Sequence, residues 1–143
     1  MSDDHTSAEI RERIRTQAGN RCGYCLSPQH LVYASLEIEH NIPKAKGGVD
    51  DEGNLCLACR LCNSFKATQT TALDPLTGDR VQIFNPRLQR WSEHFAWSND
   101  GARIIGQTPI GRATVIALQL NNLIAVKVRR EWVSVGWHPP EVV

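Results

Sequence analysis

Two short cysteine pairs, Cys22-Gly-Tyr-Cys25 and Cys59-Arg-Leu-Cys62, determine how the first half of this 143-residue chain is expected to fold. Each pair has the spacing C-x2-C, and 33 residues separate Cys25 from Cys59. Two such pairs supply four thiolates in a tetrahedron around Zn²⁺. Because four protein ligands leave no position for water, we expect a structural ion rather than a catalytic one. The segment between the pairs must then form a folded excursion.

The remaining cysteine, Cys56, falls outside this spacing and is interpreted as a small buried apolar residue. The total of five cysteines is odd, which argues against a complete disulfide framework. Two alternatives to zinc are unrelated thiols and an iron site that carries electrons. The iron alternative leaves the residues between the two cysteine pairs unexplained.

The composition is that of an ordinary soluble globular protein, with 41% hydrophobic and 22% charged residues. No apolar run is long enough to span a membrane, and the acidic start Met1-Ser2-Asp3-Asp4 lacks the apolar stretch of a secretory signal. We therefore expect a cytoplasmic protein with no membrane partner. The net charge of +1 shows no basic excess, so any binding to nucleic acid must depend on local placement of charge.

Residues 7–18 are expected to form an amphipathic helix. Thr6 and Glu9 have the spacing of a capping box, and the apolar residues Ile10, Ile14 and Ala18 recur at four-residue intervals. Three arginines lie on the other faces of this helix: Arg11, Arg13 and Arg15. A solvated charged face is favoured for them over contact with phosphate.

After the first cysteine pair, the pattern predicts a strand over residues 31–39 that stops at His40. A loop over residues 41–54 contains Pro43 and three glycines, and a short apolar strand follows at residues 55–58. A helix is expected over residues 63–68. The predicted order is therefore strand, loop, strand, helix, with a cysteine pair on each side of the excursion.

Residues 71–143 are expected to form a second α+β segment that packs on the first, giving domains at 1–70 and 71–143. Turn residues at 74–79 and 98–101 predict β-hairpins, and helices are predicted over 111–120 and 122–133, the first preceded by Thr108-Pro109. Arg129 and Arg130 near the end of the last helix are interpreted as a charged face over a tryptophan core, in preference to contact with phosphate or a base.

The residues between and beside the cysteine pairs resemble the HNH endonuclease family. The resemblance covers about residues 10–70 and is carried by Glu39-His40-Asn41-Ile42-Pro43, Gly47-Gly48, Asn54-Leu55, Cys59-Arg-Leu-Cys62-Asn63 and Lys66. Two departures from the usual pattern are Glu39 in place of Asp and Asn63 as the third family letter, which makes this an H-N-N variant. The family implies an α+β fold with a ββα-metal core, here braced by the four-cysteine zinc site.

The resemblance also implies hydrolysis of DNA phosphodiester bonds with one divalent cation. His40 is then the general base, because a neutral imidazole can accept a proton near pH 7. Glu39 and Asn63 are the expected ligands of Mg²⁺ or Mn²⁺, which bind few protein oxygens and several waters. Asn54 is expected to brace the loop that positions His40, and Lys66 to contact phosphate.

Each of these assignments has an ordinary alternative. Glu39 could be a surface carboxylate, Asn63 a helix N-cap and Asn54 a turn residue, while Lys66 could be a solvated lysine on a helix. The alternative function is a zinc-braced module that binds nucleic acid without cutting it. Retention of Glu39, His40 and Asn63 argues against that module, because binding alone does not need them.

Overall fold

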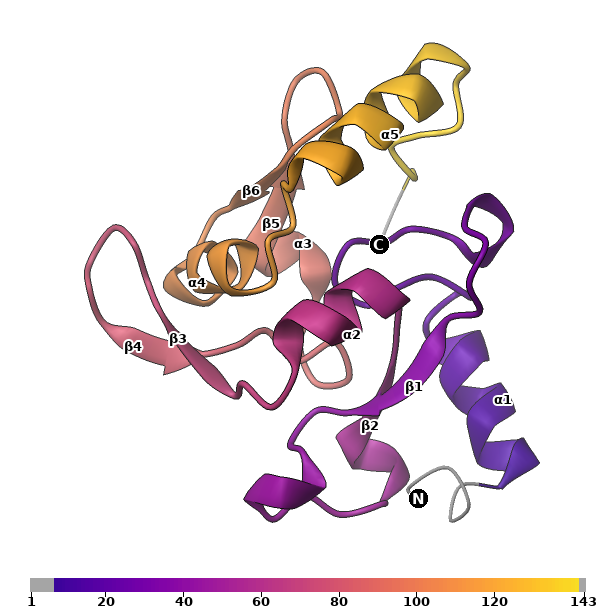
Figure 1. Ribbon diagram of the computed structural model, residues 1–143, viewed down its shortest axis with the longest axis vertical. Helices are drawn as coiled ribbons and strands as arrows, with labels where there is room; N and C mark the ends of the chain where they lie inside the picture. The colour runs from indigo at the N-terminus through magenta and orange to yellow at the C-terminus, as the bar shows by residue number, and fades with distance from the viewer. Residues whose placement is uncertain (1–6, 142–143) are drawn as a thin grey trace. The chain divides into compact units, whose positions relative to one another are not determined.

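An antiparallel hairpin forms the centre of the first half of the chain (Figure 1). In the computed structural model, which describes residues 7–141, strand β1 (Glu37–His40) pairs with β2 (Leu55–Ala58). Helix α2 (Arg60–Lys66) follows β2 after a single residue. This order of two strands and a helix confirms the α+β class and the ββα core.

Helix α1 (Ala8–Gln17) covers one face of this hairpin with its apolar stripe. Ile14 lies in a buried cluster with Leu36, Leu55 and Leu57. The N-cap is Ser7, whose hydroxyl accepts a hydrogen bond from the Ile10 amide at 3.1 Å. The expected N-cap Thr6 lies outside the described residues, and within them the N-cap is Ser7.

Strand β1 is shorter than the predicted strand over residues 31–39, and it includes His40 as its last residue. The Gln29 side chain explains the late start, because it bonds to the Leu36 amide and the Ala34 carbonyl and satisfies backbone groups that a strand would pair. Helix α2 begins at Arg60 rather than residue 63, since the Cys59 sulfur caps it by accepting from the Cys62 amide. It ends at Lys66 because Ala67 adopts a positive φ of 48°.

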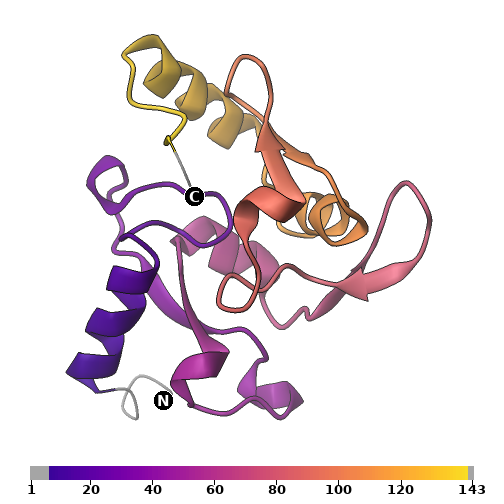
Figure 2. The ribbon, with the colours of Figure 1, turned by 180° about the vertical axis from the view of Figure 1, so that it is seen from behind.

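The second half of the chain contains two further hairpins, formed around the predicted turns. Strand β3 (Thr71–Leu73) pairs with β4 (Arg80–Gln82), and β5 (Phe95–Trp97) pairs with β6 (Ile104–Gly106). Three helices are α3 (Trp91–His94), α4 (Pro109–Ala117) and α5 (Leu123–Ser134) (Figure 2). The single turn α3 was not predicted. Helix α4 starts earlier than predicted because Thr108 caps it directly before Pro109, and it ends at Ala117, two residues before Gln119 adopts a positive φ of 49°.

Arg129 on α5 corrects the interpretation of that helix as a charged face. Its side chain is buried, and its guanidinium donates to the carbonyls of Ala102 and Leu120 at 2.8 and 2.7 Å. Arg130 is exposed and lies 3.9 Å from Asp100. One of the two arginines is therefore a structural part of the core, and the other is on the surface.

The described residues divide into two compact units. The N-terminal unit contains the chain up to Thr70 together with Asn85–Leu88, and the C-terminal unit contains Thr71–Phe84 and the residues from Gln89 onward. Among the described helices, none has the length and apolar character needed to cross a membrane.

Candidate active site

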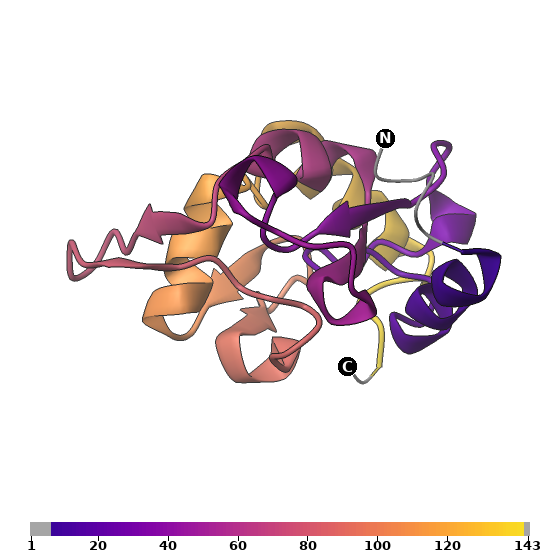
Figure 3. The ribbon, with the colours of Figure 1, turned by 90° about the horizontal axis from the view of Figure 1, so that it is seen from below.

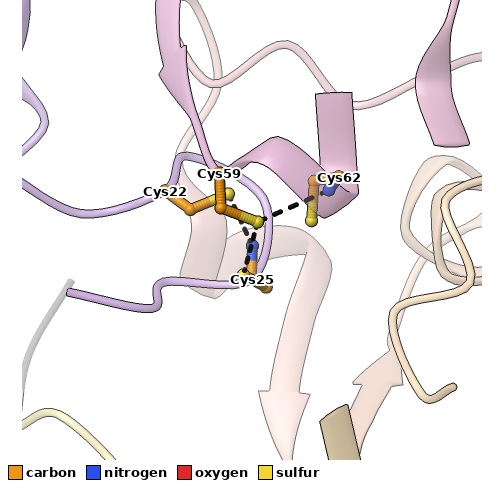
Figure 4. A group of neighbouring side chains, drawn as sticks. All are labelled: Cys22, Cys25, Cys59 and Cys62. Atoms are coloured by element: carbon orange, nitrogen blue, oxygen red, sulfur yellow. Dashed lines mark hydrogen bonds between the residues drawn. The ribbon is translucent and has the colours of Figure 1, made fainter. Parts of the chain in front are cut away.

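The four paired cysteines lie together in the N-terminal unit, where the loop after α1 meets the start of α2 (Figure 4). Their sulfur atoms all lie within 4.8 Å of one another, and Cys25 Sγ is 3.8 Å from Cys59 Sγ. A tetrahedral zinc site with Zn–S bonds of about 2.3 Å has sulfur–sulfur edges of about 3.8 Å. The donor set therefore fits a structural zinc ion, held by Cys22, Cys25, Cys59 and Cys62.

Backbone amides point at these sulfurs in the way that thiolate ligands require. The amides of Tyr24 and Cys25 donate to Cys22 Sγ at 3.4 and 3.5 Å, and the Cys62 amide donates to Cys59 Sγ at 3.4 Å. Hydrogen bonds of this kind favour the charged form of the acceptor. Cys56 is not among the four clustered cysteines, and burial raises the pKa of its thiol well above the ordinary value.

One face of β1 carries acidic side chains toward α2. Successive side chains of a strand point to opposite faces, so Glu37 and Glu39 share a face. Asn63 Nδ2 donates to Glu37 Oε1 at 2.7 Å, and one helical turn later Lys66 Nζ lies 3.4 Å from Glu39 Oε2. Figures 1 and 3 show α1 and α2 on opposite sides of the hairpin, in agreement with these contacts.

Glu39 and Lys66 form a buried ion pair, with exposed fractions of 5% and 2%. Lys66 Nζ also donates to the carbonyls of His40 and Asn41, and the Tyr24 hydroxyl donates to Glu39 Oε2 at 3.1 Å. Burial raises the pKa of the Glu39 carboxyl above its ordinary value, and the Lys66 charge opposes this shift. Lys66 is therefore not a solvated lysine, and its ammonium is directed at the end of β1 instead of outward to a phosphate.

Three buried polar atoms near this pair have no hydrogen-bond partner within the described part of the chain: Glu39 Oε1 and both amide atoms of Asn41. Asn41 lies two residues beyond Glu39. An unsatisfied buried oxygen costs about 1–3 kcal/mol, so such an atom normally has a ligand or water. Carboxylate and amide oxygens are the donors that Mg²⁺ and Mn²⁺ bind. The residues at the β1–α2 face therefore fit the cation that the family resemblance implies.

His40 points away from this acidic face and into the loop that follows β1. Its Nε2 lies 2.7 Å from Asp50 Oδ1, and Asp50 Oδ2 lies 3.0 Å from Lys44 Nζ. The hydrogen bonds from His40 and Lys44 hold the pKa of the Asp50 carboxyl below its usual value. The imidazole thus contacts a carboxylate that sequence reasoning did not single out, rather than Glu39 or Asn63.

Asn54 closes the neck of the same loop. Its Oδ1 accepts from the Ile42 amide at 2.9 Å, and its Nδ2 donates to the carbonyls of Ile42 and Val49. Gly48 lies against the Ile42 carbonyl so closely that a Cβ atom would not fit. These contacts fix the segment that carries Asp50.

Two comparisons with known proteins found similar sequences. The family model described as HNH endonuclease matches residues 22–69, from the first cysteine of the cluster to just beyond Lys66. Residues 22–69 are therefore similar to the HNH endonuclease family over about a third of the chain. Over 116 residues the chain is also 28% identical to Septu protein PtuB of Bacillus thuringiensis, a match that covers 80% of this chain and 42% of that protein. The chain thus spans about two fifths of the length of the curated relative it matches.

The search of solved structures found no significant match. The HNH domain contains all four clustered cysteines and the predicted site residues Glu39, His40, Asn54, Asn63 and Lys66. The model matched at residues 22–69 is that of a nuclease-type domain.

The structure brings the predicted residues of the HNH domain together in two groups. Asn63 and Lys66 meet the acidic face of β1, whereas His40 and Asn54 belong to the loop. Sequence reasoning missed Glu37, which shares a strand face with Glu39, and the alternation of side chains could have indicated it. It also missed Asp50, for which no spacing rule gives a signal.

Proposed function

We propose that this protein is a metal-dependent HNH endonuclease that hydrolyses DNA phosphodiester bonds. A structural zinc ion at the four-cysteine cluster braces the domain, and one Mg²⁺ or Mn²⁺ ion binds at Glu39 and Asn63. The observation that carries the proposal is the unsatisfied Glu39 Oε1, buried at the end of β1 beside His40 in a segment of this family.

Each residue at the β1–α2 face then has a part in holding the cation. When bound, the cation supplies Lewis-acid stabilisation of the charge that develops on the leaving oxygen. Glu39 offers Oε1 while its Oε2 is held by Lys66 and Tyr24. Glu37 accepts from the Asn63 amide nitrogen and so orients the Asn63 oxygen. Lys66 is a positioning residue, because it contacts Glu39 Oε2 and its charge opposes the rise that burial causes in the pKa of that carboxyl.

His40 is the general base in this proposal, and Asp50 is its positioning residue. A neutral imidazole whose Nε2 bonds to a carboxylate carries its proton on Nε2, which leaves Nδ1 as the acceptor. Nδ1 then takes a proton from the attacking water. Asp50 is itself held by Lys44, and Asn54 holds the loop, so the imidazole keeps one orientation.

The test is cleavage of supercoiled plasmid by zinc-loaded protein in the presence of Mg²⁺ or Mn²⁺. His40→Ala is expected to lower the rate about 10²- to 10⁴-fold, because general-base catalysis contributes that much. His30→Ala, the same change at an exposed histidine of the same domain, is the matched control and should leave the rate unchanged. Zinc content and circular dichroism of both variants should equal those of the wild type.

Two outcomes would contradict the proposal. Equal cleavage by His40→Ala and wild type removes His40 from the mechanism. Tight binding of DNA without scission in either cation favours the zinc-braced binding module. The observation that favours this second candidate is the contact of His40 with Asp50 rather than with Glu39.

A further inference from the structure

An open groove in the N-terminal unit is lined by three arginines. It has a volume of about 610 Å³, and its walls include Arg11 and Arg15 of α1 and Arg60 at the start of α2. The rest of the lining comes from residues 34–38, which include Glu37 of β1, and from Asn63 of α2. A second hollow of about 630 Å³ shares Glu37, Arg60 and Asn63 and continues along α2 to Ala67. We call the two together the arginine groove.

The helical positions of the α1 arginines explain why two of them reach this groove and one does not. Arg11 and Arg15 are four residues apart, so they lie on one face of α1. Arg13 lies about 200° around the helix from each of them, since successive residues are separated by about 100°. Arg13 accordingly contacts Glu52, with Nη2 2.8 Å from Oε1. Arg11 and Arg15 are half-buried, which fits side chains laid along a groove wall.

We propose that the arginine groove binds the sugar–phosphate backbone of the DNA substrate, at phosphates away from the bond that is cut. This inference rests on the proposed function and assigns its substrate path. The net charge of the chain is only +1, so affinity for a polyanion must come from a local concentration of cations. The planar fork of a guanidinium matches the oxygens of a phosphate, and the groove presents three such forks.

The groove borders the proposed cation site, because Asn63 lines it, whereas His40 does not. Glu37 lines the groove and is three residues from His40 along β1, a separation of about 10 Å at 3.3 Å per residue. Each strand of B-DNA carries one phosphate per about 3.4 Å of helix axis. The arginines are therefore expected to contact phosphates that neighbour the scissile one. Such contacts set register and affinity without reading the base sequence.

The test measures the affinity of zinc-loaded protein for a short fluorescent DNA duplex across a series of salt concentrations. A double variant, Arg11→Gln with Arg15→Gln, is expected to weaken binding roughly tenfold or more and to reduce the slope of log K against log salt by about 2. Arg60→Gln should reduce the slope by about 1. In cleavage assays the loss should appear as a raised KM rather than a lowered kcat.

Arg13→Gln is the matched control, because it removes the same charge from the same helix on a different face. It should leave affinity and salt slope unchanged, and zinc content should be the same in all variants. Unchanged affinity in the double variant, or an equal loss in Arg13→Gln, would overturn the inference.

The same measurements separate this inference from the proposed nuclease activity. His40→Ala should bind the duplex as tightly as the wild type, because His40 is not among the residues that line the groove. Arginine-dependent binding without any scission would refute the nuclease proposal and retain the groove. Scission that does not depend on the groove arginines would support the nuclease proposal and refute the role of the groove.

Discussion

The N-terminal unit and the C-terminal unit reach stability by different means. The N-terminal unit packs a cluster of four buried aliphatic side chains beside the four-cysteine site, and its strand β1 ends in a buried ion pair. The C-terminal unit is built around aromatic rings, with Phe84, Trp91 and Trp97 each about 5 Å, centroid to centroid, from another ring. The two units thus differ in what surrounds their cores: a candidate metal cluster in the N-terminal unit and a group of aromatic rings in the C-terminal unit.

Buried polar groups of the C-terminal unit are nearly all satisfied by specific partners. Asp74 is fully buried, and its two oxygens accept from Arg112 at 2.9 Å each and from the Leu76 amide and the Thr77 hydroxyl. In the N-terminal unit Glu39 and Asn41 keep unsatisfied atoms. Such groups are costly and concentrate where function requires them. The unsatisfied Glu39 and Asn41 atoms therefore mark the N-terminal unit as the one that contains the candidate site.

Removal of zinc should give the largest difference in stability between the two units. Structural zinc contributes about 10–16 kcal/mol, which exceeds the net stability of most domains, about 5–15 kcal/mol. A chelator is therefore expected to unfold the N-terminal unit. All four tryptophans belong to the C-terminal unit, and both tyrosines, Tyr24 and Tyr33, belong to the N-terminal unit. Loss of helical circular dichroism and of the tyrosine signal should occur without a shift in tryptophan emission.

Added zinc should restore the dichroism and the tyrosine signal, which distinguishes unfolding from chemical damage. A red shift of the tryptophan emission that coincides with the loss of dichroism would show that the C-terminal unit does not stay folded without the N-terminal unit. The two units would then have to be treated as one cooperative structure.

The buried Glu39–Lys66 pair gives the next largest effect. Lys66→Met leaves the Glu39 carboxylate buried without its counter-charge, and breaking such a pair costs about 3–5 kcal/mol. Urea unfolding followed by circular dichroism should show this loss. The double variant Glu39→Gln with Lys66→Met should recover part of it, because no charge is then left buried. Equal stabilities of the single and double variants would mean that the pair is not buried in solution.

Acid should weaken the C-terminal unit through Asp74. Arg112 holds the pKa of the Asp74 carboxyl well below its ordinary value in the folded state. The ordinary value is about 3.9, so the stabilisation is present above about pH 4 and is lost as pH falls toward the folded pKa. Tryptophan emission should report this loss between about pH 4 and pH 2. Asp74→Asn should be less stable at neutral pH, and the difference from wild type should shrink as the pH is lowered through that range.

The sequence predicted the parts of the HNH domain that depend on spacing along the chain. The cysteine pairs, the order of His40, Asn54 and Asn63, and the turns at 74–79 and 98–101 are local patterns, and the structure contains them. Each follows from the chemistry of neighbouring residues, whose relative positions the backbone limits to a few possibilities. Element ends were less accurate, since side chains such as Gln29 and Cys59 determine where β1 and α2 begin.

Partners that are distant in the chain could not be predicted in this way. Asn63 contacts Glu37 across 26 residues, and Arg13 contacts Glu52 across 39 residues. Alternation and helical spacing state which side chains share a face, but they do not state which residue lies opposite. For this reason the burial of Lys66 and the division of the α1 arginines between a groove and an ion pair became visible only in the structure.

Substitution of Cys56 should give the smallest change in stability, and it tests whether zinc binding depends on the four paired cysteines alone. It is buried opposite Glu39 in the hairpin, and its sulfur is 4.0 Å from the Tyr24 hydroxyl. Cys56→Ala removes one sulfur atom from the packing and is expected to cost about 1 kcal/mol, with the zinc content unchanged. Cys59→Ala makes the same chemical change three residues later and should abolish zinc binding and the fold of the N-terminal unit. Loss of zinc in Cys56→Ala would show that the fifth thiol takes part in the cluster. Cys56 of strand β2 would then link the β1–β2 hairpin directly to the metal site.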